Sequence, residues 1–199
     1  MIIKVTLQSI LQTIAWTIVC GVILPLLLTV AFQTLFPYQA NGSLITVGGK
    51  LVGSELLAQQ FTGDKYFWPR PSANSYGSSP SGLVTSSGSN LGPTSAQLQT
   101  NVQANAKALR AAHHLPDNAP VPADLVFASA SGLDPHISPE AARFQVARVA
   151  AARGLSADRV AALVEQHVEL SQWGFLGEPR VNVLVLNLAL DNEVPGKQP

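Results

Sequence analysis

The side chains best suited to chemistry lie in one short stretch that contains Ser131, Asp134 and His136. Serine, histidine and aspartate form the triad of many hydrolases, in which the histidine takes the proton of the serine hydroxyl. Triads are assembled in space, and side chains this close in sequence rarely reach that geometry. We therefore interpret the stretch as a turn at Asp134 that leads to a helix capped by Ser138, and keep a hydrolase as an alternative function.

Other kinds of site find little support in the sequence. A phosphate-binding loop needs G-x-x-x-x-G-K and then Ser or Thr, but Leu44 stands where the first glycine should be and Leu51 follows Gly49-Lys50. The histidines and the one cysteine show no pair at metal-ligand spacing, so no metal site is expected. The chain carries 12 basic and 12 acidic residues, which argues against a nucleic-acid surface. The residues therefore predict no enzyme class and no tightly bound cofactor.

The element that organises the chain is a long apolar stretch near its N-terminus. No Asp, Glu, Lys or Arg occurs between Lys4 and Lys50. About 20 mostly apolar residues suffice to cross about 30 Å of hydrocarbon, whereas cleaved signal peptides have an apolar region of only about 7–15 residues. We predict a transmembrane helix over residues 10–36, a short N-terminal segment over residues 1–9 and an external domain over residues 37–199.

Two features of this span bear on its surroundings. The basic residue closer to it is Lys4, so the positive-inside rule predicts a cytoplasmic N-terminus and a periplasmic domain anchored in a bacterial inner membrane. Pro25 lies mid-span and predicts a kink, and Gly21, four residues earlier, leaves room for a close neighbour. Contact with another subunit's helix and an ordinary kinked anchor in lipid stay open as alternatives.

The external part is predicted to be an α+β domain, a small sheet covered by helices. Strands are expected over residues 43–47 and 50–53, joined by a Gly48-Gly49 hairpin turn, and over residues 123–128 and 181–190, the last turning helical near its end. Helices are expected after four capping positions, Ser54, Thr94 or Ser95, Ser138 and Ser156. A long loop is expected over residues 72–93.

Three aromatic residues and two prolines mark residues 66–71, Tyr-Phe-Trp-Pro-Arg-Pro. Such a segment is stiff and extended, because proline fixes its own φ and restricts the residue before it. Its rings either fill the core of the domain or form a surface plug for a partner. Of these two interpretations we favour the core.

Six stretches that follow the N-terminal span occur in a characteristic order. They are Gln39–Ile45, Val52–Gln59, Tyr66–Ala73, Gly88–Thr94, Ser129–Ser138 and Val181–Asp191. In this order and spacing they resemble the KdpC family, the C subunit of the bacterial potassium-transporting P-type ATPase. The resemblance covers nearly the whole chain.

The resemblance implies a non-catalytic accessory subunit of a high-affinity, ATP-driven potassium uptake pump, needed for assembly and stability of the complex. It implies three partners besides the lipid bilayer: a potassium-channel-like A subunit, an ATP-hydrolysing B subunit and a small F subunit. Members are described as raising the ATP affinity of the B subunit, and Gln145 matches the glutamine proposed there to touch nucleotide. An outward domain does not meet cytoplasmic ATP, so we expect the domain on the external mouth of the A subunit.

Docking to the partner subunits is expected to involve both parts of the chain. The candidate docking residues are Gly21, Pro25, Tyr66, Phe67, Arg70, Asn90 and Asp134. No catalytic residue is expected under this function, because ATP hydrolysis belongs to the B subunit and ATP is met only through it. A membrane-tethered periplasmic hydrolase that uses Ser131, Asp134 and His136 remains the alternative.

Overall fold

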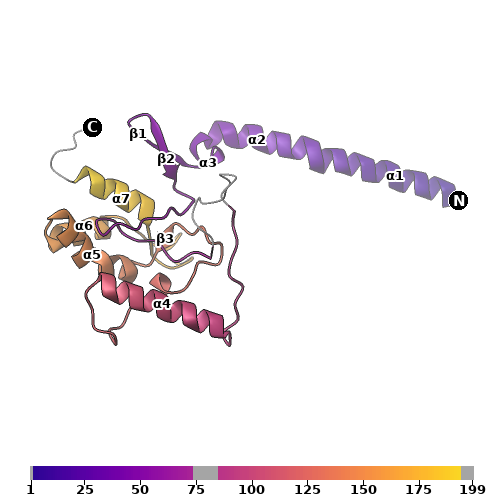
Figure 1. The fold of residues 1–199 in the computed structure, drawn as a ribbon. Helices are drawn as coiled ribbons and strands as arrows, with labels where there is room; N and C mark the ends of the chain where they lie inside the picture. Colours follow the sequence, from indigo (N-terminus) through magenta and orange to yellow (C-terminus); the bar gives the residue numbers. More distant parts are fainter. Residues whose placement is uncertain (1, 74–84, 194–199) are drawn as a thin grey trace. The chain divides into compact units, whose positions relative to one another are not determined.

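The computed structural model describes residues 2–73 and 85–193, and they fall into two compact units that divide after Leu44 (Figure 1). The first unit is a long apolar helix, and the second is a domain of helices with small antiparallel sheets. The predicted fold class is therefore confirmed. Part of the loop predicted over residues 72–93 lies outside the described residues, and residues 85–92 form neither helix nor strand.

The first unit is helical almost throughout. It comprises α1 (Ile2–Ile18), a π-helical turn (Val19–Ile23), α2 (Leu24–Leu35) and the short α3 (Pro37–Ala40). The 34 residues from Ile2 to Leu35 are long and apolar enough to cross a membrane. Among the described residues, no side chain of α1 or α2 is buried, so the helix exposes its apolar surface.

The π-helical turn sits directly before Pro25. A proline inside an α-helix lacks an N–H and its ring clashes with the carbonyl four residues earlier, here that of Gly21. In the π-helical turn the N–H of Leu24 donates to the carbonyl of Val19, one residue further back than in an α-helix. The wider turn explains how the helix continues through the proline rather than ending there.

The second unit starts with a hairpin of β1 (Leu44–Val47) and β2 (Lys50–Ser54). Gly48 and Gly49 have φ of 56° and 76°, as the predicted two-residue turn requires. The helix predicted after Ser54 is wrong, because a turn forms in which Ser54 Oγ accepts from the N–H of Leu56 at 3.1 Å. The chain then leaves helical geometry because the N–H of Ala58 donates to the carbonyl of Leu133 at 3.0 Å.

The body of the domain consists of helices around a three-stranded sheet. The helices are α4 (Ala96–Ala112), α5 (Pro139–Arg153), α6 (Ala157–Gln166) and α7 (Val183–Asn192). The strands are β3 (His136–Ile137), β4 (Val168–Glu169) and β5 (Arg180–Asn182), in the antiparallel order β3-β5-β4. His136 pairs with Asn182, and Val168 pairs with Val181.

Capping serines begin α4, α5 and α6 where the sequence predicts. Ser95, Ser138 and Ser156 each accept a hydrogen bond from the N–H three residues later, which satisfies one of the free donors of a helix start. Gly154 ends α5 in the left-handed conformation, at φ 66°. The core then forms from the apolar faces of α5, α6 and α7 together with Phe67.

One predicted strand is wrong, and a second is longer than the strand that forms. Residues 123–128 form a single turn of 3₁₀-helix (Ala123–Leu125), in which the carboxylate of Asp124 accepts from the N–H of Ser138 at 2.7 Å. The strand predicted over residues 181–190 ends at Asn182, and the rest is helix α7. Asn182 causes the change, because its side chain accepts from the N–H groups of Leu184 and Val185 and so caps a helix.

Candidate functional site

Residues 64–71, which include the aromatic segment, make many hydrogen bonds to distant side chains of the second unit. Phe67 is fully buried, so the predicted core interpretation is confirmed for this ring. The segment belongs to no strand, and it therefore needs partners other than a sheet for its backbone groups. Side chains from α5 and α7 supply them.

Two buried amides hold the centre of the segment. Asn187 of α7 accepts from the N–H of Phe67 at 2.8 Å and donates to the carbonyl of the same residue at 3.0 Å. Gln145 of α5 does the same for Trp68, at 2.8 and 3.2 Å. Successive residues of an extended chain direct their backbone groups to opposite sides. The segment therefore runs between α5 and α7, with one amide from each helix.

Two arginines of α5 hold the start of the segment. Arg148 donates to the carbonyls of Asp64 at 2.6 Å and Tyr66 at 3.0 Å. Arg153 donates to the carbonyl of Lys65 at 2.6 Å. Together with the two amides, these bonds give every carbonyl of residues 64–68 a side-chain donor. We call Gln145, Arg148, Arg153 and Asn187 the clamp.

Arg148 also organises the aromatic groups around the clamp. Its guanidinium lies 4.1 Å from the centre of the Trp68 ring, and its Nε donates to Nε2 of His113 at 3.2 Å. Burial, and then the positive charge of Arg148, lower the pKa of His113 from 6.5 to about 4. His113 is therefore neutral at pH 7, and the nitrogen that accepts from Arg148 carries no proton.

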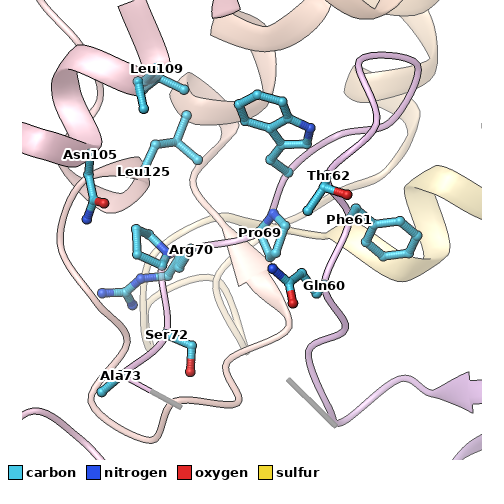
Figure 2. A pocket seen from close by; sticks show the side chains of 13 residues that line it. Gln60, Phe61, Thr62, Pro69, Arg70, Ser72, Ala73, Asn105, Leu109 and Leu125 are labelled. Atoms are coloured by element: carbon cyan, nitrogen blue, oxygen red, sulfur yellow. The ribbon is translucent and has the colours of Figure 1, made fainter. Parts of the chain in front are cut away.

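A cavity of about 490 Å³ opens beside the segment (Figure 2). Figure 2 shows Leu109 and Leu125 together at one end of it and Ser72 and Ala73 at the other. The lining combines the apolar faces of Trp68, Pro69 and Pro71 with the polar side chains of Arg70 and Asn105. Within the described residues, no group of three or more His, Cys, Asp or Glu side chains could hold a metal ion.

The three side chains considered for a hydrolase are not arranged as a nucleophile and its base. Ser131 Oγ lies 3.2 Å from Ser129 Oγ and accepts from the N–H of Leu133 at 3.1 Å. Among the residues that the structure describes, no hydrogen bond joins Ser131 to His136. The stretch is therefore the turn that the sequence predicts.

The Asp134 carboxylate stabilises that turn and is not placed as an acid or a base. Its carboxylate accepts from Arg70 at 2.9 Å and from the N–H of His136 at 3.0 Å. Burial alone would raise the pKa of the Asp134 carboxyl, but the hydrogen bonds from His136 and Arg70 outweigh it and lower the pKa to about 2. A carboxylate with so low a pKa is a poor general base at neutral pH.

Gln145 lies where a nucleotide does not reach it without rearrangement. The side chain is fully buried, and its oxygen accepts from both Trp68 and Arg148. A nucleotide would have to replace bonds that hold the aromatic segment. Contact between Gln145 and nucleotide stays a prediction.

The remaining predicted docking residues are scattered over the two units. Tyr66 is half-buried and donates to Asp191 at 3.3 Å, and Phe67 has no exposed surface. Asn90 is exposed, with φ of 51°. Gly21 and Pro25 lie in and just after the π-helical turn of the first unit. The structure brings Arg70 and Asp134 together, and docking by any of these residues stays a prediction.

Sequence reasoning missed Arg148, Arg153 and Asn187. Arg148 follows Gln145 by three residues and so shares its face of α5, where a buried cation is unusual. Asn187 interrupts an apolar run, and a polar residue at a buried position indicates a specific hydrogen-bond partner. The buried cation on α5 and the polar residue in an apolar run could each have indicated a specific hydrogen bond. Neither pattern identifies the backbone groups of residues 64–68 as the partners.

Comparisons with known proteins agree over nearly the whole chain. The family described as "KdpC: K+-transporting ATPase, c chain" matches residues 6–192. A protein of Geobacter sulfurreducens is 54% identical over 189 residues, which cover 94% of this chain and 97% of that protein. One of Dechloromonas aromatica is 56% identical over 177 residues, 88% of this chain and 91% of its own. Both are named "Potassium-transporting ATPase KdpC subunit".

Proposed function

Since this chain belongs to the KdpC family of K+-transporting ATPase subunits, we propose that it is the non-catalytic accessory subunit of a high-affinity potassium uptake pump, needed for assembly and stability of the complex. Its partners in this proposal are a channel-like A subunit, an ATP-hydrolysing B subunit and a small F subunit. The N-terminus is cytoplasmic, and the second unit faces the periplasm at the inner membrane.

The observation that carries the proposal is the clamp. The polar side chains that cluster in the external domain are occupied by backbone groups of residues 64–68, and Asp134 is occupied by Arg70. Side chains that are hydrogen-bonded in this way stabilise the fold of the domain, and they are not free to bind and transform a substrate. A rigid body on a membrane helix suits a subunit that acts through contact.

The apolar helix supplies the second support. Within the described residues none of its side chains is buried, so its apolar surface is available to lipid and to the helices of other subunits. Gly21 offers no side chain, and nothing lies within 4 Å of where one would start. Together with Pro25 it marks the position where another helix can approach closely.

Removal of the chain tests the function. The other subunits, produced with and without this chain, are purified through a tag on the channel-like subunit. We expect the complex that lacks the chain to fall apart or to lose potassium-stimulated ATP hydrolysis. An intact and fully active complex without the chain would refute the proposal.

An effect on ATP affinity, in our proposal, passes through the ATPase subunit and not through Gln145. The burial of Gln145 supports this route, because its amide has no exposed surface. Binding of labelled ATP to the full chain in detergent, at millimolar concentration, provides the test. Binding that Gln145→Ala abolishes, in a variant whose thermal unfolding shows it folded, would establish direct contact instead.

Orientation is tested with cysteine chemistry, because Cys20 is the only cysteine. A Cys20→Ser chain with Leu51→Cys on the exposed hairpin is treated in intact cells with a maleimide that does not cross the inner membrane. We expect labelling, whereas labelling only after the membrane is opened would place the domain in the cytoplasm.

A further inference from the structure

The connection between β4 and β5 exposes an unusual amount of apolar surface. Trp173 is 84% exposed and Phe175 is 79% exposed, and Leu170 and Leu176 are exposed beside them. No charged residue occurs from Leu170 to Gly177. We call residues 170–177 the aromatic tip.

The aromatic tip is a defined structure and not a loose loop. Gln172 and Leu176 exchange two backbone hydrogen bonds, each 2.9 Å long, and the N–H of Gly174 donates to the carbonyl of Ser171 at 3.0 Å. The rings of Trp173 and Phe175 lie side by side, with their centres 6.5 Å apart. The two apolar rings are therefore presented together on one short turn.

The backbone of Trp173 is in a strained conformation. Its φ is 53°, in the left-handed region that bulky side chains rarely adopt. Such a conformation costs about 1–2 kcal/mol for a residue other than glycine. Strain of this kind, on an exposed ring that contributes nothing to the core, is typical of positions where a side chain has a function outside the fold.

The tip is also firmly mounted. It connects β4 to the central strand β5, where Val168 pairs with Val181 and Glu169 with Arg180. An ion pair of 2.9 Å between Arg180 and Glu169 closes its base. A tip held by a strand pair loses little conformational freedom when a partner covers it, which favours binding.

Charge favours a protein over a lipid surface as the occupant. The charged residues that flank the tip are Glu169, Glu178 and Arg180, so the net charge at its base is negative. An anionic bilayer attracts segments rich in Lys and Arg and would repel this base. An apolar pocket with a basic rim on a protein matches both the uncharged tip and its acidic base.

We propose that Trp173 and Phe175 are the docking anchor of the external domain, inserting into an apolar, basic-rimmed pocket on another subunit of the potassium-transporting ATPase. This inference rests on the proposed function. Two aromatic side chains bury about 150–250 Å² each, well below the roughly 800 Å² per partner of a stable interface. The anchor is therefore the centre of a larger contact, as aromatic hot spots usually are.

Affinity for the rest of the pump tests the anchor. The other subunits are produced together with the full chain as the wild type, as Trp173→Ala with Phe175→Ala, or as Leu51→Ala with Leu56→Ala. Each complex is purified in detergent, and the concentration at which the chain dissociates on dilution is compared. The control pair removes two exposed apolar side chains from the start of the same domain. We expect the anchor variant to bind at least about tenfold more weakly and the control to bind like the wild type.

A photoreactive group separates the two kinds of occupant. With Phe175→benzoylphenylalanine in the assembled complex, illumination is expected to link the chain to one other subunit, and the same group at Leu51 is not. Links to lipid alone, or equal losses of affinity in the anchor and control variants, would overturn the inference. If the wild-type chain does not bind the other subunits, the proposed function is wrong. If the wild type and the anchor variant bind equally well, the function stands and only the assignment of the anchor is wrong.

Discussion

Residues 66–68 and residues 173–176 look alike in the sequence and end in opposite environments. Each combines a tryptophan and a phenylalanine with a further ring or leucine. Phe67 is fully buried and its neighbours are held by the clamp, whereas Trp173 and Phe175 are almost fully exposed. Aromatic composition alone therefore does not distinguish a core segment from a surface one.

The difference lies in what the rest of the chain provides. The first segment has an amide or a guanidinium for each carbonyl from residue 64 to residue 68. The second makes its backbone bonds within its own turn, and no described part of the chain buries its rings. One segment is completed by this chain, and the other is left for a partner.

The largest expected difference between the two segments is the loss of stability when one ring is removed from each. Phe67→Ala should lower the free energy of unfolding by about 3–5 kcal/mol, because it leaves a cavity in the core. Phe175→Ala should change it by no more than about 0.5 kcal/mol, because the ring touches mostly solvent. Urea-induced unfolding of the full chain in detergent measures both, and similar losses would show that the two rings are equally part of the core.

The clamp is tested through Asn187→Leu. The change leaves the buried N–H and carbonyl of Phe67 without partners, and we expect a loss of about 2–4 kcal/mol in the free energy of unfolding. Gln97→Leu is the matched control, because Gln97 is an exposed amide on α4 that bonds only to Asn101 in the described residues. Equal stability of the two variants would mean that the clamp contributes nothing.

Acid should weaken the clamped region in two separate steps. From pH 6.5 down to about 4 the unfolded chain takes up a proton on His113 that the folded chain does not, so the free energy of unfolding falls. Asp134 acts lower, between its ordinary pKa of 3.8 and about 2. We expect His113→Gln to flatten only the first step, and the neighbouring His114→Gln to leave it in place. Unfolding curves at a series of pH values would decide, and an unchanged slope in His113→Gln would contradict the assignment.

The smallest expected effect concerns the strained position in the aromatic tip. Trp173→Asn places a residue that tolerates positive φ there, and should raise the free energy of unfolding by about 0.5–1 kcal/mol. The same change should weaken binding to the pump, so stability and binding move in opposite directions. A loss of stability in Trp173→Asn would mean that the ring supports the fold of this chain.

Local features of the fold could be predicted from the sequence, and the clamp could not. Ser95, Ser138, Ser156 and the Gly48-Gly49 turn act within a few residues and were predicted correctly, whereas Ser54 begins no helix. The apolar run over residues 181–190 turns helical earlier than predicted, because a buried strand and a buried helix share that composition and only the cap at Asn182 sets the point of change.

The clamp escaped prediction because its partners are far apart in the chain. Gln145 and Trp68 are 77 residues apart, and Asn187 and Phe67 are 120 apart. Backbone carbonyls carry no sequence signature, so nothing at residues 64–68 indicates which side chains will bind them. Only the resemblance to the KdpC family singled out Gln145, and it implied contact with nucleotide and not with Trp68.

The long separations within the clamp also have a consequence for the order of folding. Contacts between distant residues require closure of a large loop, which costs entropy that local helix contacts do not. The helical hairpin of α5 and α6 can therefore form early, and the threading of residues 64–68 between α5 and α7 should come last. Pulse-labelling hydrogen exchange would show it as late protection of the Phe67 and Trp68 amides. Until that step the rings of the aromatic segment are exposed to solvent like those of the aromatic tip. The partly folded domain is therefore the form most prone to aggregate.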